Sequence, residues 1–298
     1  MAKSVGVTLS EQIHTGFVVD HKLVGGLRRF PADEDDYGAL VEMHTEALVE
    51  TICEQIVAAA DGEKNLDAVG LAVPGLVKSG VVEEAPNLAQ LKGARLRDLL
   101  SMKLHDHGIA APVMVLNDAD GVAAGLAARH GKLDSMIRVW TIGMGIGHGR
   151  YPHTAGVWEG GHTVVTLDEK ETFCGCGGRG HLEGIMGHRA MRLRFLDMEP
   201  DEVFEAAKKG DPRCLEFKKL YHKALAAATA SSIHMAGPGK FFLTGTYVKN
   251  IDLPMLKDYM QQMVKMSPLQ GYSIEVVEES AETRVIGSAV SAEQAAGL

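Results

Sequence analysis

The chain has 298 residues, of which 46% are apolar, so it can bury one large core or two medium-sized ones. Its formal net charge of −9 argues against nucleic acid as the main partner, because nucleic-acid-binding proteins usually present a basic face. The sequence shows neither the apolar run of a signal peptide nor that of a membrane-spanning helix, and its four cysteines are too unevenly spaced for a secreted disulfide framework. We therefore expect a soluble cytoplasmic protein that binds neither nucleic acid nor a membrane.

The first half of the chain alternates strands and helices. Three strands with short turns are predicted at the start, in residues 3–9, 14–20 and 21–30. Helical spacing of apolar residues then predicts a helix over 39–60. The elements predicted after it are strands at 66–75 and 80–88, a helix at 95–107, a strand at 112–118 and a small-residue helix at 119–131.

The second half repeats this order of elements. Residues 136–151 predict a strand, a glycine turn and a strand, and the region around 173–178 is irregular. The elements predicted after it are helices at 187–196, 201–209 and 212–235, a strand at 240–245, a helix at 253–266, a strand at 273–278 and a last helix from 281. Alternation in both halves indicates two α/β domains, 1–117 joined by the helix 281–298, and 118–280.

Two of the four cysteines lie one residue apart in the stretch FCGCGGRGHLEG, residues 173–184, where glycines permit a tight turn. His181 follows Cys176 by five residues, and His162 precedes Cys174 by twelve. These two thiols and two imidazoles form a set that tetrahedral zinc accepts, and four protein ligands would make the ion structural. The alternative is two free thiols and two ordinary histidines.

Two carboxylates accompany these four residues. Glu159 lies three residues before His162, and Glu183 lies two residues after His181. Carboxylates tethered to one metal site, with no cation beside them in sequence, suit a ligand rich in hydroxyl groups. The alternative for either residue is an ordinary solvent-exposed glutamate.

Several stretches together resemble the ROK family of repressors and sugar kinases, over nearly the whole chain. They occur in the family's order: LAVPGLV, APNL, LNDAD, IGMGIGHG, WEGGH and CGCGGRGHLE. The resemblance implies the actin-like, hexokinase-like fold, which has two α/β domains around a cleft. It also implies transfer of the γ-phosphoryl group of ATP to a sugar hydroxyl, with magnesium accompanying the nucleotide and zinc in the cysteine loop.

The resemblance also implies roles for individual residues on the sugar side. Asp118 would be the general base on the attacking hydroxyl of a glucose-like hexose, a role that a carboxylate at a strand end can fill. Without the resemblance, Asp118 could equally be the N-cap of the helix that follows. The residues implied in sugar binding are Asn87, Asn117, Asp118, Glu159, His162 and Glu183.

On the nucleotide side, glycine turns would let backbone N–H groups approach phosphate oxygens. The implied residues are Gly143, Gly145, Gly147 and Gly149 for a phosphate loop, and Thr244, Gly245 and Thr246 for the adenosine side. From the residues alone, the first set is better explained as a tight hairpin between two strands.

The sequence departs from the family pattern in two places. His181 stands where the family usually has a third cysteine, a change that zinc tolerates. The second place is the first phosphate loop, where Thr8 replaces an aspartate that helps to position magnesium. Ser10, Glu11 and Gln12 replace Gly-Gly-Thr there, and a carboxylate at Glu11 would repel a triphosphate.

Three functions remain open on this evidence. An active hexose kinase with an unusual phosphate loop is favoured by the presence of Asp118, whereas the altered loop favours a sugar-binding protein without activity. A ROK-type repressor is disfavoured, because such proteins carry an additional N-terminal helix-turn-helix and the first strand here begins near Met1. A donor other than ATP is also compatible with the altered loop, and we expect a homodimer or homotetramer.

Overall fold

The computed structural model describes residues 1–33, 36, 38–154, 156–278 and 280–298. They form two compact units, each described here by itself. Unit 1 comprises Met1–Ile137, Gly149–Trp158 and Ser280–Leu298, and unit 2 comprises Arg138–His148 and Glu159–Glu279. This division differs from the boundary expected after residue 117, because the helix that follows packs against the C-terminal helix and belongs to unit 1.

Unit 1 is built on a five-stranded sheet with the strand order β3-β2-β1-β4-β7. The bounds of its strands are β1 (Lys3–Leu9), β2 (Ile13–Val19), β3 (Lys22–Phe30), β4 (Ala68–Val73) and β7 (Val113–Asn117). The first three strands form the predicted antiparallel meander, whereas β1, β4 and β7 pair in parallel. The carboxyl ends of these parallel strands therefore lie at one edge of the sheet, the place where α/β sheets usually bind ligands.

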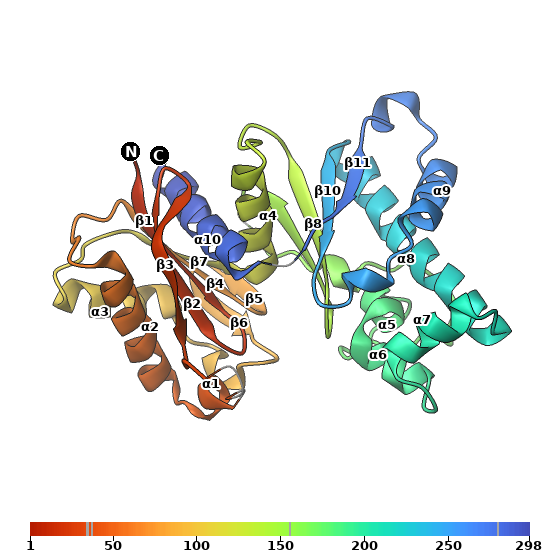
Figure 1. Ribbon diagram of the computed structural model, residues 1–298, viewed down its shortest axis with the longest axis horizontal. Helices are drawn as coiled ribbons and strands as arrows, with labels where there is room; N and C mark the ends of the chain where they lie inside the picture. The colour runs from red at the N-terminus through yellow and green to blue at the C-terminus, as the bar shows by residue number, and fades with distance from the viewer. Residues whose placement is uncertain (34–35, 37, 155, 279) are drawn as a thin grey trace. The chain divides into compact units, whose positions relative to one another are not determined.

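Helices cover both faces of this sheet, as Figure 1 shows, with α2 and α3 on one face and α4 and α10 on the other. Their bounds are α2 (Thr45–Ala60), α3 (Leu96–Asp106), α4 (Asp118–Arg129) and α10 (Ala281–Ala296). Along β1, Val5, Val7 and Leu9 point into the core with α2, and Gly6 faces α10. A Cβ atom on Gly6 would lie 1.9 Å from the carbonyl oxygen of Val285, so glycine permits the close approach of α10.

Unit 1 differs from the sequence prediction in two details. The helix expected over 39–60 is broken at Met43, whose backbone is extended at φ −74° and ψ 136°. The short strand β5 (Leu76–Lys78), which pairs with β6, has too few residues to show a pattern and was not predicted. The remaining elements of unit 1 are α1 (Ala39–Glu42), β6 (Val81–Glu84) and the 3-10 helix η1 (Ala89–Leu91).

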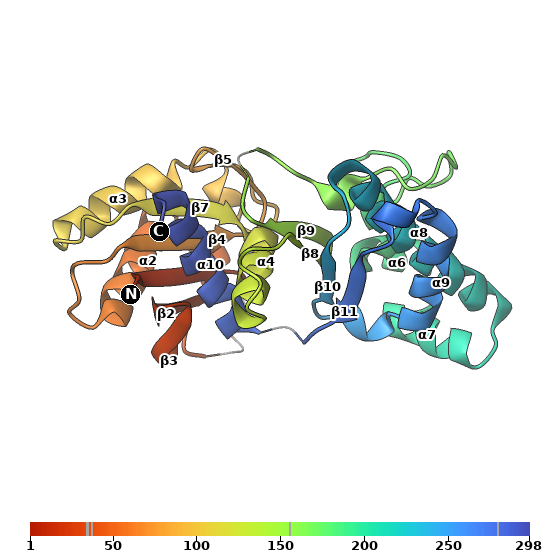
Figure 2. The ribbon, with the colours of Figure 1, turned by 90° about the horizontal axis from the view of Figure 1, so that it is seen from above.

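Unit 2 contains a four-stranded sheet with the order β11-β10-β8-β9. The strands are β8 (Ile137–Ile142), β9 (Ile146–Tyr151), β10 (Lys240–Thr244) and β11 (Ser273–Val276). Figure 2 shows α8 and α9 on one side of this sheet. The helices are α5 (Leu182–Met186), α6 (His188–Arg194), α7 (Pro200–Lys208), α8 (Pro212–Ala236), α9 (Leu253–Met263), and the 3-10 helices η2 (Gly160–His162), η3 (Val248–Asn250) and η4 (Ser267–Leu269).

The core of unit 2 lies between the sheet and these helices, where aromatic rings pack edge to face. Phe217 packs against Phe195 at 5.0 Å, and Phe204 packs against Tyr221 at 5.0 Å, between ring centroids. These contacts anchor α8, which is rich in alanine and 25 residues long. Among the helices of the described residues, none combines the length and the apolar composition that crossing a bilayer requires.

Candidate functional site

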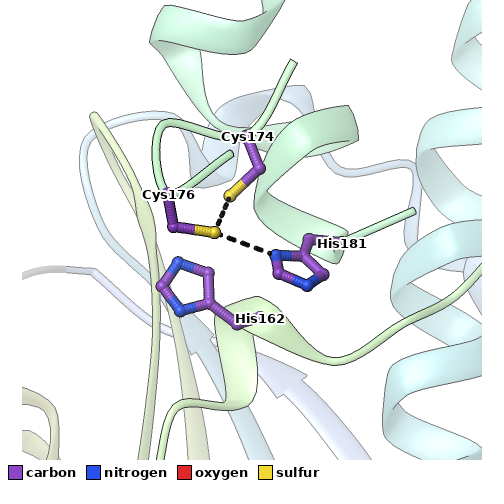
Figure 3. A group of neighbouring side chains, drawn as sticks. All are labelled: His162, Cys174, Cys176 and His181. Carbon is purple, nitrogen blue, oxygen red and sulfur yellow. Dashed lines mark hydrogen bonds between the residues drawn. The ribbon is translucent and has the colours of Figure 1, made fainter. Parts of the chain in front are cut away.

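The four residues expected to bind metal lie in one short region of unit 2. His162 ends η2, Cys174 and Cys176 lie in the irregular loop, and His181 is the N-cap residue of α5. The segment after His162 is paired with the segment around His181, because the N–H of Leu182 donates to the carbonyl of Thr163 at 3.0 Å. Figure 3 shows the four side chains pointing toward one another, and we call them the metal-ligand cluster.

The geometry of the metal-ligand cluster fits a tetrahedral zinc ion. One ligand atom from each of the four residues lies within 4.8 Å of all the others. The Sγ atoms of Cys174 and Cys176 are 3.4 Å apart, and Nδ1 of His181 is 3.3 Å from Sγ of Cys176. Zinc–sulfur bonds of about 2.3 Å would place two thiolates of a tetrahedral site roughly 3.8 Å apart, which is close to this spacing.

Burial acts in opposite directions on the thiol and imidazole groups of the metal-ligand cluster. It raises the pKa of the Cys174 thiol to about 12 and lowers the pKa of His181. His181 is therefore in the neutral form that binds metals at neutral pH, whereas a bound cation would have to displace the proton of Cys174.

Two glycines of the loop are required by close approaches of neighbouring atoms, one of them in the metal-ligand cluster. A Cβ atom on Gly178 would lie 2.1 Å from Cε1 of His181. Gly180 has a φ of +68°, and a Cβ atom there would lie 2.0 Å from the carbonyl oxygen of Thr166. Glycine therefore both permits the turn and lets the imidazole come close to the backbone.

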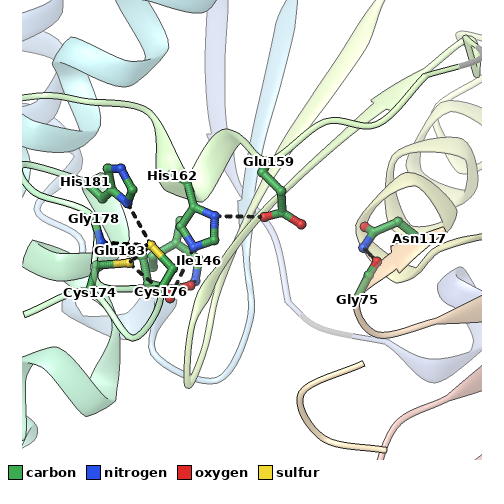
Figure 4. A network of polar contacts seen from close by, with 10 residues as sticks. All are labelled: Gly75, Asn117, Ile146, Glu159, His162, Cys174, Cys176, Gly178, His181 and Glu183. Carbon is green, nitrogen blue, oxygen red and sulfur yellow. Dashed lines mark hydrogen bonds and ion pairs between the residues drawn. The ribbon is translucent and has the colours of Figure 1, made fainter. Parts of the chain in front are cut away.

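The carboxylates of Glu159 and Glu183 flank the His162 imidazole, as Figure 4 shows. Oε2 of Glu159 is 3.6 Å from Nδ1 of His162, and Oε1 of Glu183 is 3.8 Å from Nε2. The other oxygen of Glu183 accepts a hydrogen bond from the N–H of Ile146 at 3.0 Å. The structure therefore brings both carboxylates to the metal-ligand cluster and fixes one of them on β9.

The glycine turn between β8 and β9 is closed by a hydrogen bond from the N–H of Gly143 to the carbonyl of Gly145 at 3.0 Å. A Cβ atom on Gly145 would lie 2.4 Å from Oε2 of Glu183. At Gly149, a Cβ atom would lie 1.8 Å from the carbonyl oxygen of Ala119. The predicted hairpin is therefore present. Close packing alone explains glycine at positions 145 and 149, whether or not a phosphate binds there. Gly147 also lies within β9.

The second predicted glycine turn follows β10. Thr244 is the buried last residue of that strand, and Thr246 is exposed. Gly245 has a φ of +106°, and a Cβ atom there would lie 2.6 Å from the carbonyl oxygen of Ile142. The N–H of Tyr247 donates to this same carbonyl at 3.0 Å, so the turn packs against the end of β8.

In unit 1, Asn117 and Asp118 join the end of β7 to the start of α4. The side-chain oxygen of Asn117 accepts from the N–H of Ala119 at 2.9 Å, and its amide donates to the carbonyl of Gly75 at 2.7 Å. The helix N-cap is therefore Asn117 rather than Asp118. Oδ1 of Asp118 also accepts from the Ala119 N–H, at 2.9 Å.

Burial raises the pKa of Asp118 to about 6, against the lowering effects of the Ala119 N–H and of Arg284. A carboxylate with such a pKa is largely ionised at pH 7 and more basic than an ordinary aspartate. The last predicted sugar residue, Asn87, is exposed in the turn where the N–H of Leu88 donates to the carbonyl of Ala85 at 3.2 Å.

The altered loop between β1 and β2 is closed by its own polar groups. The N–H of Ser10 donates to the carbonyl of Gln12 at 3.0 Å. The amide of Gln12 donates to the carbonyls of Pro31 and Asp33, each at 3.3 Å. Glu11 is exposed at the tip of the turn. The Ser10 N–H is therefore bonded within the turn rather than directed to a ligand.

Sequence reasoning missed the backbone partners that position these side chains. The carbonyl of Gly75 holds Asn117, and the N–H of Ile146 holds Glu183. The signal for the first was the Pro74–Gly75 turn directly after a buried strand, which marks a backbone free of strand pairing.

Residues 39–295 match the ROK family. The chain is 26% identical over 243 residues to a glucokinase of Pyrobaculum calidifontis, an alignment that covers 76% of this chain and 79% of the relative. It is 27% identical over 215 residues to an N-acetylmannosamine kinase of Haemophilus influenzae, covering 68% of this chain and 70% of that protein.

Solved structures share the fold. A ROK hexokinase from Thermus thermophilus superposes with a TM-score of 0.77 at 23% identity over 98% of both chains. A ROK family glucokinase from Streptomyces griseus, in complex with glucose and AMPPNP, gives 0.68 at 20% identity over 98% of this chain and 100% of that one. The fold is the actin-like, two-domain α/β fold that the sequence predicted. With 257 of its 298 residues spanned by the family match, from 39 to 295, the chain belongs to the ROK family.

Proposed function

We propose that the protein is a sugar kinase that transfers a phosphoryl group from a nucleoside triphosphate to a hydroxyl group of a glucose-like hexose. Membership of the ROK family supports this function, as do relatives that are glucokinases and N-acetylmannosamine kinases. The names of the relatives refer to different sugars, so the choice of a glucose-like hexose rests on the glucokinases among them.

The observation that carries the proposal is the placement of Asp118. Its carboxylate lies at the end of β7, is held by the Ala119 N–H, and has a pKa raised to about 6 by burial. As the new O–P bond forms, the sugar hydroxyl would give its proton to this carboxylate. The donor's terminal P–O–P bond would break, and the electron pair would leave with the nucleoside diphosphate.

We assign sugar binding to the six residues that the family resemblance implies. Carboxylates accept hydrogen bonds from sugar hydroxyls, and the side chains of Glu159 and Glu183 are only partly buried. The assigned residues are Asn87, Asn117, Asp118, Glu159, His162 and Glu183. Zinc in the metal-ligand cluster would have a structural role, because four protein ligands leave no position for substrate. His162 would then have its ring fixed between the two glutamates.

We assign the donor to the two glycine turns, with magnesium accompanying the triphosphate. The residues are Gly143, Gly145, Gly147 and Gly149 between β8 and β9, and Thr244, Gly245 and Thr246 after β10. Turns without side chains let backbone N–H groups come close to phosphate oxygens.

A second candidate function, sugar binding without turnover, is favoured by the turn between β1 and β2. Thr8 offers no carboxylate for magnesium, and the Ser10 N–H is bonded to the Gln12 carbonyl. A protein with this turn and intact sugar residues could serve as a sensor of a hexose.

One experiment separates these two functions. The full chain would be assayed with Mg-ATP and a panel of glucose, mannose, fructose and N-acetylmannosamine, with release of ADP coupled to NADH oxidation. Calorimetric titration with the same sugars would run beside it. Turnover of a hexose supports the kinase, binding without turnover supports the sensor, and failure of every sugar to bind overturns both.

A further inference from the structure

The two thiols of the metal-ligand cluster form a close pair on one tight turn. Sγ of Cys174 and Sγ of Cys176 are 3.4 Å apart. The turn that carries them is closed by a hydrogen bond from the N–H of Gly177 to the carbonyl of Cys174 at 3.1 Å, and Gly177 has a φ of +80°. Two sulfurs already in contact can form a disulfide bond with little movement of the backbone.

The two cysteines differ in their access to solvent. Cys176 is exposed, whereas Cys174 is buried. The thiolate, and not the thiol, both binds metals and reacts with oxidants, so a zinc ion in the cluster would keep both sulfurs deprotonated. An accessible thiolate beside a second thiolate is the usual arrangement of redox-sensing cysteines, in which the first sulfur meets the oxidant and the second completes the disulfide.

The other two cysteines of the chain are poor targets for an oxidant. Cys53 and Cys214 are both buried, and neither belongs to the metal-ligand cluster. Burial raises the pKa of the Cys53 thiol to about 11 and also raises the pKa of Cys214. Both thiols therefore stay protonated and shielded from solvent, so an oxidant would act on Cys176.

A cation lies against the turn that carries the two thiols. Nη1 of Arg189 is 3.2 Å from where a Cβ atom on Gly175, the residue between the two cysteines, would be. A guanidinium group this close favours negative charge, both on a thiolate and on a hydroxide that leaves an oxidant. The turn therefore combines an accessible sulfur, a second sulfur in contact with it and a positive charge.

We propose that Cys174 and Cys176, which we call the thiol pair, are a site of reversible oxidation by a hydroperoxide, and that this oxidation releases zinc. The Cys176 thiolate attacks the hydroxyl oxygen of the hydroperoxide, the O–O bond breaks, the other oxygen leaves as an anion, and a sulfenic acid forms. The Cys174 thiolate then attacks the Cys176 sulfur, the S–O bond breaks, hydroxide leaves and the S–S bond forms. The two sulfurs lose two electrons, the hydroperoxide gains them, and two protons from solvent neutralise the two leaving anions.

The disulfide removes both sulfur ligands from the metal-ligand cluster. His162 and His181 alone remain, and two imidazoles are half of the four ligands that a structural zinc site needs. Exposed disulfides are also labile, because their reduction potentials are more oxidising than those of buried structural disulfides. A thiol reductant together with zinc would therefore restore the cluster.

Oxidation would also affect a carboxylate that we assign to sugar binding. Sγ of Cys174 is 3.8 Å from Oε1 of Glu183, and this oxygen is 3.8 Å from Nε2 of His162. Both neighbours of the carboxylate shift when Cys174 bonds to Cys176 instead of to a metal. We expect sugar affinity to fall about tenfold, the effect of losing one hydrogen bond to a charged group, and this expectation alone rests on the proposed function.

The test treats the zinc-loaded full chain with hydrogen peroxide. A chromogenic chelator measures the released zinc, which should rise from near zero to about one ion per chain. The tryptic peptide 171–179 contains both cysteines, and its mass should fall by that of two hydrogen atoms. Dithiothreitol with added zinc should reverse both changes. Zinc that stays bound, or a peptide that keeps both thiols, overturns the inference.

The variant Cys176→His separates oxidation of the thiol pair from other damage. Histidine is a zinc ligand, so the variant should keep the ion with a single thiol in the cluster, and peroxide should release zinc about tenfold more slowly than from the wild type. Cys214→Ala is the control outside the cluster and should lose zinc like the wild type. Equal release from Cys176→His and the wild type contradicts the inference. If the variant binds no zinc, the peptide mass of the wild type decides.

A second pair of variants tests the cation. Arg189→Gln should slow zinc release about fivefold, the effect of one charge at a water-like dielectric. Arg192→Gln is the matched control, because Arg192 lies on the same helix, α6, and is paired with Glu199 at 3.2 Å. It should release zinc at the wild-type rate. Equal rates in the two variants would exclude Arg189 from the oxidation site.

Calorimetric titration of sugars into the reduced and the oxidised chain separates this inference from the proposed function. Failure of the reduced chain to bind any sugar overturns the proposed function, whereas zinc release and peptide mass still test the thiol pair. Zinc release with unchanged sugar affinity supports the oxidation site and overturns its effect on Glu183. Weaker sugar binding that dithiothreitol and zinc reverse supports both.

Discussion

The metal-ligand cluster of unit 2 and the β1–β2 turn of unit 1 use their polar groups in opposite ways. In the cluster, four side chains from residues 162–181 converge, and Gly178 leaves the space that the His181 ring needs. In the turn, the Ser10 N–H and the Gln12 amide are bonded to nearby carbonyls. The side chains of the cluster are arranged to bind a metal ion, whereas these polar groups of the turn are already hydrogen-bonded within the protein. The two regions have therefore departed from the ROK family pattern to different extents.

The largest expected effect is that of replacing Asp118, the proposed general base. Asp118→Asn should lower kcat with the best hexose about 10²- to 10⁴-fold, because the uncharged amide cannot accept the hydroxyl proton. Sugar affinity should stay within a few fold, since the amide keeps the size and one acceptor. Steady-state kinetics and calorimetry would measure both.

Asp120→Asn is the matched control for that variant. Asp120 is a buried carboxyl of α4, and it accepts a hydrogen bond from the N–H of Arg150 at 2.9 Å. An amide oxygen can keep this bond, so kcat should change by only a few fold. Equal losses of turnover in the two variants would show that Asp118 acts through the fold and not as the base.

The second effect concerns the metal that the cluster would hold. Cys176→Ser should reduce the bound zinc from about one ion per chain to near zero, because a serine hydroxyl is a poor zinc ligand. Cys214→Ala is the control, since Cys214 is a buried cysteine of α8 outside the metal-ligand cluster. Elemental analysis after purification in metal-free buffer gives the stoichiometry. A wild-type protein that contains no zinc would contradict the assignment of the cluster as a metal site.

A third, smaller effect tests why the β8–β9 turn contains glycine. Gly145→Ala should displace the Glu183 carboxylate from the Ile146 N–H and weaken sugar binding about tenfold. Gly143→Ala is its neighbour in the same turn, where a Cβ atom would meet only the Gly145 carbonyl oxygen at 3.9 Å. It should leave sugar affinity unchanged. Calorimetry distinguishes the two, and equal losses in both would favour a general need for glycine in the turn.

Much of the fold followed from local patterns, because alternating strands and helices are recorded in the spacing of apolar residues. The metal-ligand candidates could also be read from the sequence, since all four lie within one short stretch rich in glycine. Interactions between residues far apart in sequence could not be predicted in this way. Nothing near Arg284 in sequence indicates that its charge lowers the pKa of both His14 and Asp118. Nor did the pattern show that Gly145 makes room for Glu183, because that contact joins residues 38 positions apart.

The smallest effect is one of stability, and it again involves Asp118. In the folded chain its pKa is raised from 3.8 to about 6, so the folded state holds the proton more tightly than the unfolded state does. The group therefore favours folding most below about pH 4, and this contribution is lost as the pH rises through 6. At pH 7.5 the buried charge opposes folding, so Asp118→Asn should raise the melting temperature by a few degrees. The gain should shrink steadily as the pH falls toward about 4.5. Asp134→Asn, at an exposed aspartate, should show no such trend. Thermal melts of both variants across this range would measure the difference, and a gain that grows at low pH would mean that burial does not raise the pKa of Asp118.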